Sequence, residues 1–112
     1  MPPELFQDLA DSPHALLLGF REPEEYRRAH LAGVQLCSLR HLLEHVDDLP
    51  RDRTLLLCCR SGRRTSRALR VLEDQGFEHV YGLRGGIFAW RCHQLPVIVE
   101  DDDPIPVFRD ES

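Results

Sequence analysis

The chain has 112 residues, a length that fits one domain. Hydrophobic residues make up 42% of it and charged residues 29%, so a hydrophobic core can form and a disordered or collagen-like composition is excluded. The formal net charge is −5 and no apolar run approaches the roughly 18–20 residues that cross a bilayer, so we expect neither a nucleic-acid-binding protein nor a membrane protein.

Two features lead us to expect a cytoplasmic protein. The N-terminal residues include Glu4 and Asp8 and lack the basic segment of a secretory signal. The four cysteines include an adjacent pair, Cys58 and Cys59, which suits reduced and reactive thiols better than a disulfide framework.

Short apolar runs alternate with amphipathic segments along the chain. In order, we predict a helix over 4–10, a strand over 15–18, a helix over 23–29, a weaker strand over 33–37, a helix capped by Ser38, a strand over 54–58, a helix over 64–75, a strand over 79–83, a helix over 87–92 and a candidate edge strand over 96–99. Leu39, Leu42, Leu43 and Val46 recur at the spacing of one buried helix face.

Strands that alternate with helices through short connections predict an α/β fold. We expect a mainly parallel sheet of four to five strands with helices on both faces. Residues 1–99 are predicted to form the domain, and the acidic tail 100–112 is predicted to be poorly ordered.

The segment 59–64, CRSGRR, carries the most chemical information. It lies between a predicted buried strand and a helix, at the carboxyl end of the sheet, where open α/β folds bind ligands. The positive end of the helix favours the thiolate of Cys59, and Gly62 lets backbone N–H groups turn inward around the sulfur. Arg60 or Arg64 can then hold an oxyanion. The alternative is a basic turn in which Cys59 is an ordinary small apolar residue.

Several ordered motifs resemble those of the rhodanese-like sulfurtransferase family. Segment 19–26, GFREPEEY, resembles the pattern D-x-R-x-x-x-E-[YF], and segment 30–34, HLAGV, resembles H-I-x-G-A. Segment 59–65, CRSGRRT, fits the loop C-R-x-G-x-R-[ST], and segment 85–90, GGIFAW, fits the closing G-G-x-x-A-W, followed by LPV at 95–97. The chain departs from the family pattern at Gly19, where Asp is usual, at Gln94, where Gly is usual, and in lacking an obvious first strand before the opening helix.

This resemblance implies a thiosulfate sulfurtransferase-like enzyme with the rhodanese-like fold. Cys59 would be the catalytic nucleophile and would carry a persulfide. The substrate-binding residues would be Arg60, Ser61, Gly62, Arg63, Arg64 and Thr65. No metal or organic cofactor is expected. The partners would be a small anionic sulfur donor and, as acceptor, a thiol, a small redox protein or a sulfur-carrier protein.

Two other functions remain open at this stage. A cysteine phosphatase or arsenate reductase also uses a Cys-to-Arg anion loop, but its Arg lies six residues after the nucleophile, whereas Arg64 is five after Cys59 and six after Cys58. A non-catalytic binding or sulfur-relay module is the second alternative.

The remaining candidate residues have structural interpretations that we prefer. Cys37 and Cys58 are predicted to be core residues, and Trp90 a core anchor. Cys92 is a candidate resolving thiol. His41 and His45 share a helix face with no evident further metal ligand, so we expect a solvated face there.

Overall fold

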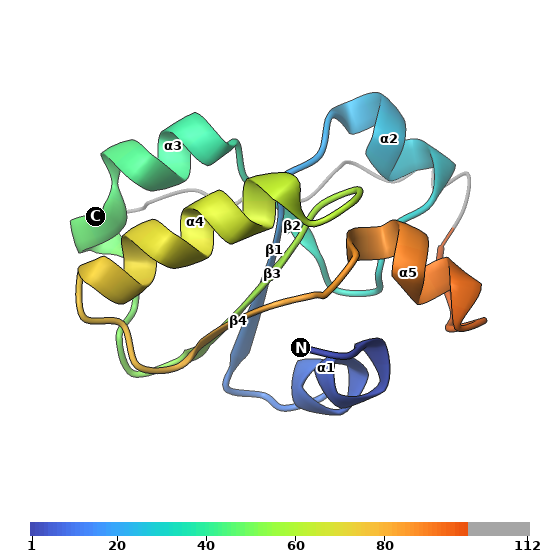
Figure 1. The fold of residues 1–112 in the computed structure, drawn as a ribbon, viewed down its shortest axis with the longest axis horizontal. Coiled ribbons are helices and arrows are strands. Elements are labelled where there is room, and N and C mark those ends of the chain that lie inside the picture. The colour runs from blue at the N-terminus through green and yellow to red at the C-terminus, as the bar shows by residue number, and fades with distance from the viewer. Residues whose placement is uncertain (99–112) are drawn as a thin grey trace.

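Four short parallel strands form the centre of the molecule (Figure 1). The structure is a computed structural model and describes residues 1–98 of the chain. The strands are β1 (Ala15–Gly19), β2 (Gln35–Leu36), β3 (Thr54–Cys58) and β4 (Val80–Gly82), in the order β2-β1-β3-β4 across the sheet. The expected α/β fold with a parallel sheet is therefore confirmed.

Helices cover both faces of this sheet. They are α1 (Pro3–Ala10), α2 (Pro23–Arg28), α3 (Leu39–Glu44), α4 (Arg63–Asp74) and α5 (Gly86–Cys92), with a 3₁₀ turn, η1, over Val46–Asp48. No helix within residues 1–98 is long and apolar enough to cross a membrane.

The leucine runs of β1 and β3 explain why these strands lie at the centre. The two strands pair in register from Ala15 and Thr54 to Gly19 and Cys58. Side chains alternate between faces, so a strand covered on both sides must be apolar throughout. One set of buried residues, which includes Leu18 and Leu57, packs with α3 and α4. The other set, which includes Leu56, packs with α1, α2 and α5.

The predicted helix after Ser38 is shorter than its apolar spacing indicated. Ser38 does cap it, because its Oγ accepts a hydrogen bond from the His41 N–H at 2.9 Å. The helix ends at Glu44, since His45 adopts φ −123° and ψ 31°, and Val46 begins η1 instead of a further α-helical turn. The prediction of one continuous helix through Val46 was therefore wrong.

The two weakest strand predictions are only partly reproduced. The predicted strand over 33–37 consists of two residues, Gln35–Leu36. In the candidate edge strand, Ile98 forms a single antiparallel bridge with His30 and joins no strand of the sheet. Val99 and the acidic tail 100–112 lie outside the described residues.

Candidate active site

The loop between β3 and α4 begins with Cys59 at the carboxyl edge of the sheet. Gly62 is the N-cap residue of α4 and has φ +99°, a left-handed conformation that a residue with a Cβ adopts only at a cost. This turn brings the Gly62 N–H within 3.0 Å of the Cys59 Sγ, to which it donates a hydrogen bond. The sulfur therefore lies at the positive end of a 12-residue helix.

These surroundings lower the pKa of the Cys59 thiol below its ordinary value. Burial alone raises this pKa, because desolvation disfavours the thiolate. The Thr65 hydroxyl beside the sulfur and the backbone N–H groups of Thr65, Gly62 and Ser61 lower the pKa and outweigh burial. The loop is thus built to stabilise negative charge on this sulfur.

The Thr65 hydroxyl is placed to serve the thiolate. Thr65 is 1% exposed, and its Oγ1 is buried without a hydrogen-bond partner among the described residues. A buried hydroxyl without a partner is costly, so its proton is available to turn toward the neighbouring sulfur when that sulfur is charged.

Cys58 and Cys59 are adjacent in sequence but belong to opposite faces of the sheet. Cys59 packs with the residues under α3 and α4, whereas Cys58 packs with those under α1, α2 and α5. Burial raises the pKa of Cys58 to about 12 and that of Cys37 to about 11. Both thiols are buried, as predicted for core residues, and only Cys59 combines burial with a lowered pKa.

The arginines of the loop do not all lie on the same side. Arg64 lies 3.6 Å from the carboxylate of Glu25 on α2 and lines a cavity beside β1. Arg60 is exposed and lines a second cavity, between α2 and α5, which Glu25 also lines. Arg63 lines neither of these cavities and faces a third, beside β4. The expected anion-binding set therefore divides, with Arg63 separated from Arg60 and Arg64.

Arg21 joins this site although the sequence analysis did not include it. Arg21 lines both the first and the second cavity, and its Nη1 donates a hydrogen bond to the carbonyl of Ala29. Its Nε is buried without a partner among the described residues. Burial lowers the pKa of Arg21, and the neighbouring Glu25 raises it. Its place in the 19–26 motif was the one signal for it.

The paired glycines 85–86 of the closing motif support the loop directly. The Ile87 N–H donates to the Cys59 carbonyl at 2.8 Å, and the Phe88 N–H donates to the Arg60 carbonyl at 3.1 Å. A Cβ on Gly86 would lie 2.3 Å from the Cys59 carbonyl oxygen, so this close approach requires glycine. By binding these carbonyls, the start of α5 fixes the peptide units of the loop.

Gly19, the departure from the family pattern, packs tightly at the end of β1. A Cβ there would lie 3.0 Å from the Val34 Cγ2 and 3.7 Å from the Cys58 Sγ. A larger side chain would therefore need Val34 to move.

His41 and His45 do not form the solvated face that we expected. Both side chains are partly buried, their rings stack with centroids 4.3 Å apart, and a ring nitrogen of His45 lies 2.9 Å from the His41 carbonyl. Among residues 1–98, no group of three or more His, Cys, Asp or Glu side chains could hold a metal ion.

Cys92 and Trp90 lie on α5. Cys92 is a free, exposed thiol, and its role as a resolving thiol stays a prediction. Trp90 is buried, and its indole N–H donates to the Pro96 carbonyl at 2.9 Å, which confirms it as a core anchor.

The fold and this site define an α/β protein with a cysteine anion loop at the carboxyl edge of a parallel sheet. The chain belongs to the rhodanese-like domain family, whose pattern matches residues 2–93. It is 34% identical over 97 residues to a sulfurtransferase of Allochromatium vinosum, an alignment that covers 87% of this chain and 91% of that protein.

Two further proteins extend the comparison. The thiosulfate sulfurtransferase GlpE of Vibrio cholerae is 28% identical over 91 residues, which cover 81% of this chain and 86% of that protein. The crystal structure of a rhodanese-related protein from Thermoplasma volcanium superposes with a TM-score of 0.75 at 25% identity, covering 89% of this chain and 97% of that one.

Proposed function

We propose that this chain is a sulfurtransferase that moves a sulfane sulfur from thiosulfate, or a similar donor, to a thiophilic acceptor through a persulfide on Cys59. The observation that carries the proposal is the Cys59 sulfur itself, which accepts a hydrogen bond from the Gly62 N–H and has a lowered pKa. A thiolate is the form that attacks sulfur, and the same N–H groups stabilise the charge of a persulfide.

The first half-reaction loads the enzyme. The Cys59 thiolate attacks the outer sulfur of thiosulfate, a new S–S bond forms, and the bond within thiosulfate breaks as sulfite leaves with the electron pair. Cys59 then carries the outer sulfur as a persulfide anion. The guanidinium groups of Arg60 and Arg64 are proposed to attract the dianionic donor, since both border cavities beside the loop.

The second half-reaction unloads it. A nucleophilic acceptor takes the outer sulfur, and the electron pair of the broken S–S bond returns to Cys59 as its thiolate. We propose a thiol, a small redox protein or a sulfur-carrier protein as acceptor. All four cysteines are free, as reduced thiols of a cytoplasmic protein would be, and we propose that compartment.

A phosphatase of this kind has its Arg six residues after the nucleophile, so phosphatase activity with Arg64 would require Cys58 as the nucleophile. Cys58 is fully buried on the other face of the sheet, and its pKa is raised to about 12, both of which disfavour that role. A non-catalytic module needs no lowered pKa on the loop cysteine, which favours the enzyme over a binding role.

The test is sulfur loading followed by intact-mass measurement. Thiosulfate should add one sulfur atom to the protein, mapped to Cys59, and cyanide should remove it with release of thiocyanate. Cys59→Ser should take up no sulfur, whereas Cys58→Ser, the matched control, should load normally.

Each other result points to a different function. A protein that takes up no sulfur but hydrolyses an aryl phosphate is a phosphatase. One that does neither is a binding module. Loading that depends on Cys58 rather than on Cys59 would contradict the assignment of the nucleophile.

A further inference from the structure

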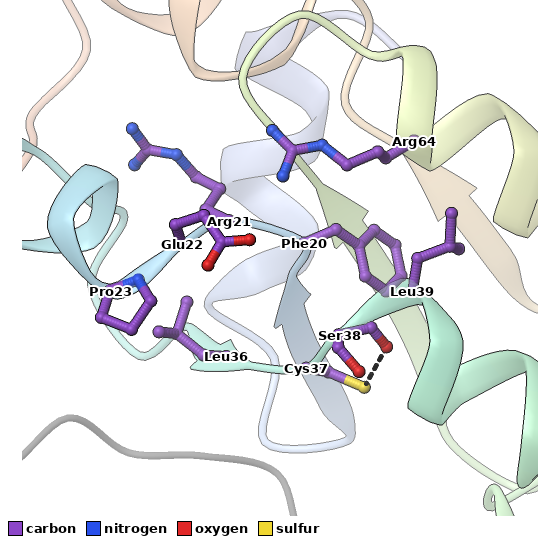
Figure 2. Close-up of a pocket in the computed structure, with 9 residues that line it drawn as sticks. All are labelled: Phe20, Arg21, Glu22, Pro23, Leu36, Cys37, Ser38, Leu39 and Arg64. Atoms are coloured by element: carbon purple, nitrogen blue, oxygen red, sulfur yellow. Dashed lines mark hydrogen bonds between the residues drawn. The ribbon is translucent and has the colours of Figure 1, made fainter.

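A cavity of about 370 Å³ lies beside the active loop (Figure 2). It is open to solvent on one side and is lined by residues that follow β1, by the start of α2, by residues from the end of β2 to the start of α3, and by Arg64 in the first turn of α4. Its volume falls within the range of roughly 300–1,000 Å³ typical of small-molecule sites. The sulfur chemistry proposed above needs only room for a small anion, so it does not account for this cavity.

Much of the cavity wall is apolar. Leu39 and Pro23 contribute accessible hydrocarbon surface, and the nearly buried side chains of Phe20 and Leu36 lie behind it. Leu39 is only partly buried, so the cavity leaves part of its side chain accessible. Such a wall favours a ligand with a hydrocarbon body over thiosulfate or another compact anion.

Positive charge is confined to one side of the cavity. Figure 2 shows the guanidinium groups of Arg21 and Arg64 on the same side, opposite Cys37 and Ser38. Glu22 also lines the cavity, but its carboxylate accepts a hydrogen bond from the first turn of α2 and is engaged there. A ligand therefore meets Arg21 and Arg64 on one side, together with the carboxylates of Glu22 in the lining and of Glu25, 3.6 Å from Arg64, and it meets hydrocarbon along its length.

Arg64 and Phe20 connect the cavity to the segment that holds the nucleophile. Arg64 lies on the first turn of the helix that Cys59 precedes, and the Phe20 N–H donates to the Cys58 carbonyl at 2.8 Å. Phe20 and Cys59 also belong to the same cluster of buried side chains. A ligand that places its reactive group between the arginines would have its body over Phe20, Leu36 and Leu39.

We propose that this cavity is the acceptor site and that it takes thiols carrying an apolar chain of several carbons. The inference rests on the proposed function. The acceptor thiol attacks the outer sulfur of the Cys59 persulfide anion, and the bond between the two persulfide sulfurs breaks. The acceptor thiol first loses its proton to solvent and attacks as a thiolate. Cys59 leaves as a thiolate with the electron pair of the broken bond, and the product is the alkyl persulfide anion. Arg21 and Arg64 favour the ionised, attacking form of the acceptor.

The experiment measures how fast different thiols discharge protein that has first been loaded with thiosulfate. The probes are ω-hydroxyalkanethiols of two, four and six carbons, which differ only in chain length, and the rate is followed by loss of the added sulfur in intact mass. The same series reacted with a small persulfide in solution corrects for intrinsic reactivity. We expect the corrected second-order rate constant to rise at least about tenfold from two to six carbons, because the added methylenes leave water.

Two substitutions in α3 test whether the dependence on chain length arises in this cavity. Leu39→Ala removes part of the cavity wall and should abolish most of the dependence on chain length. Leu43→Ala deletes the same atoms one turn further along the helix. Leu43 packs against the same core but does not line this cavity, so this variant should keep the dependence of the rate on chain length. Cyanide is too small to need the apolar wall, so its discharge of the persulfide should be similar in both variants and in the wild type.

A rate constant that does not depend on chain length, or equal losses in the two variants, would overturn the acceptor site while the proposed function stands. A protein that takes up no sulfur from thiosulfate would overturn the proposed function, and the acceptor site with it.

Discussion

A single hydroxyl group, that of Thr65, is expected to set much of the reactivity of Cys59. It is buried without a partner among the described residues and contributes to lowering the pKa of the thiol. Since the thiolate is the reactive form, a lowered pKa raises the reactive fraction at neutral pH, and the rate should reach its plateau at a lower pH than for a free thiol.

Thr65→Val removes this hydroxyl while keeping the shape of the side chain. The pKa of Cys59 should rise, so the pH profile of alkylation by iodoacetamide should move to higher pH and the rate at pH 7 should fall several-fold. Thr54→Val makes the same change at the opposite end of β3 and should leave the profile in place. An unshifted profile in Thr65→Val would mean that the backbone N–H groups alone stabilise the thiolate.

The contact between α5 and the active loop joins two elements that are far apart in sequence. The N–H groups of Ile87 and Phe88 bind the carbonyls of Cys59 and Arg60, which orients the peptide units that surround the sulfur. A peptide unit held by its carbonyl has its N–H direction fixed as well, because the unit is planar. The start of α5 is therefore part of the site although none of its side chains need touch the sulfur.

Gly86→Ala should push α5 away from this loop. Its new Cβ would lie 2.3 Å from the Cys59 carbonyl oxygen, and the residue has φ +61°. We expect the overpacking to cost about 1–3 kcal/mol of unfolding free energy in addition to about 1–2 kcal/mol for the left-handed conformation. Sulfur loading at Cys59 should slow at least about tenfold.

Gly33→Ala separates these two costs. Gly33 has φ +81°, but a Cβ there would meet no atom within 4 Å, so only the conformational cost remains. Urea unfolding of both variants gives the comparison. Equal losses of stability, with normal loading in both, would show that α5 does not fix the loop.

The N-terminal helix ties the ends of the described chain together. Phe6 of α1 is fully buried and meets the Trp90 ring of α5 edge to face, with centroids 6.3 Å apart. The Met1 amino group donates to the carbonyl of Gly82, the last residue of β4, at 3.0 Å. Helix α1 thus covers the face of the sheet that also holds α5 (Figure 1).

Phe6→Ala should destabilise the whole molecule. Loss of a fully buried aromatic ring typically costs about 3–5 kcal/mol, and the Trp90 fluorescence reports the transition in urea. The neighbouring Leu5 is 49% exposed, so Leu5→Ala should change the unfolding free energy by about 0.5 kcal/mol or less. Similar effects of the two substitutions would mean that α1 is not packed on the core.

The order and type of the elements followed from the sequence because local patterns determine them. The leucine runs of β1 and β3 favour strands buried on both faces. Helix ends are marked by the fixed φ of Pro23, the side-chain oxygen of Ser38 and the left-handed conformation of Gly76. The loop 59–64 was recognisable for the same reason, since its cysteine, glycine and arginines are contiguous.

What needed the tertiary structure were the relations between distant segments. The sequence does not show that Cys58 and Cys59 pack into different clusters, that Gly86 packs on the Cys59 carbonyl or that Arg21 borders both cavities, because each depends on where other elements pack. The pKa of a thiol depends on its burial and on the hydrogen-bond donors that folding brings to it. The pKa of Cys58 is therefore raised, whereas that of Cys59 is lowered. The sequence by itself pointed to Cys59 and the loop 59–64, because these residues are contiguous. The packing of the helices decided which donors surround that sulfur and why the pKa of Cys59 is lowered while that of Cys58 is raised.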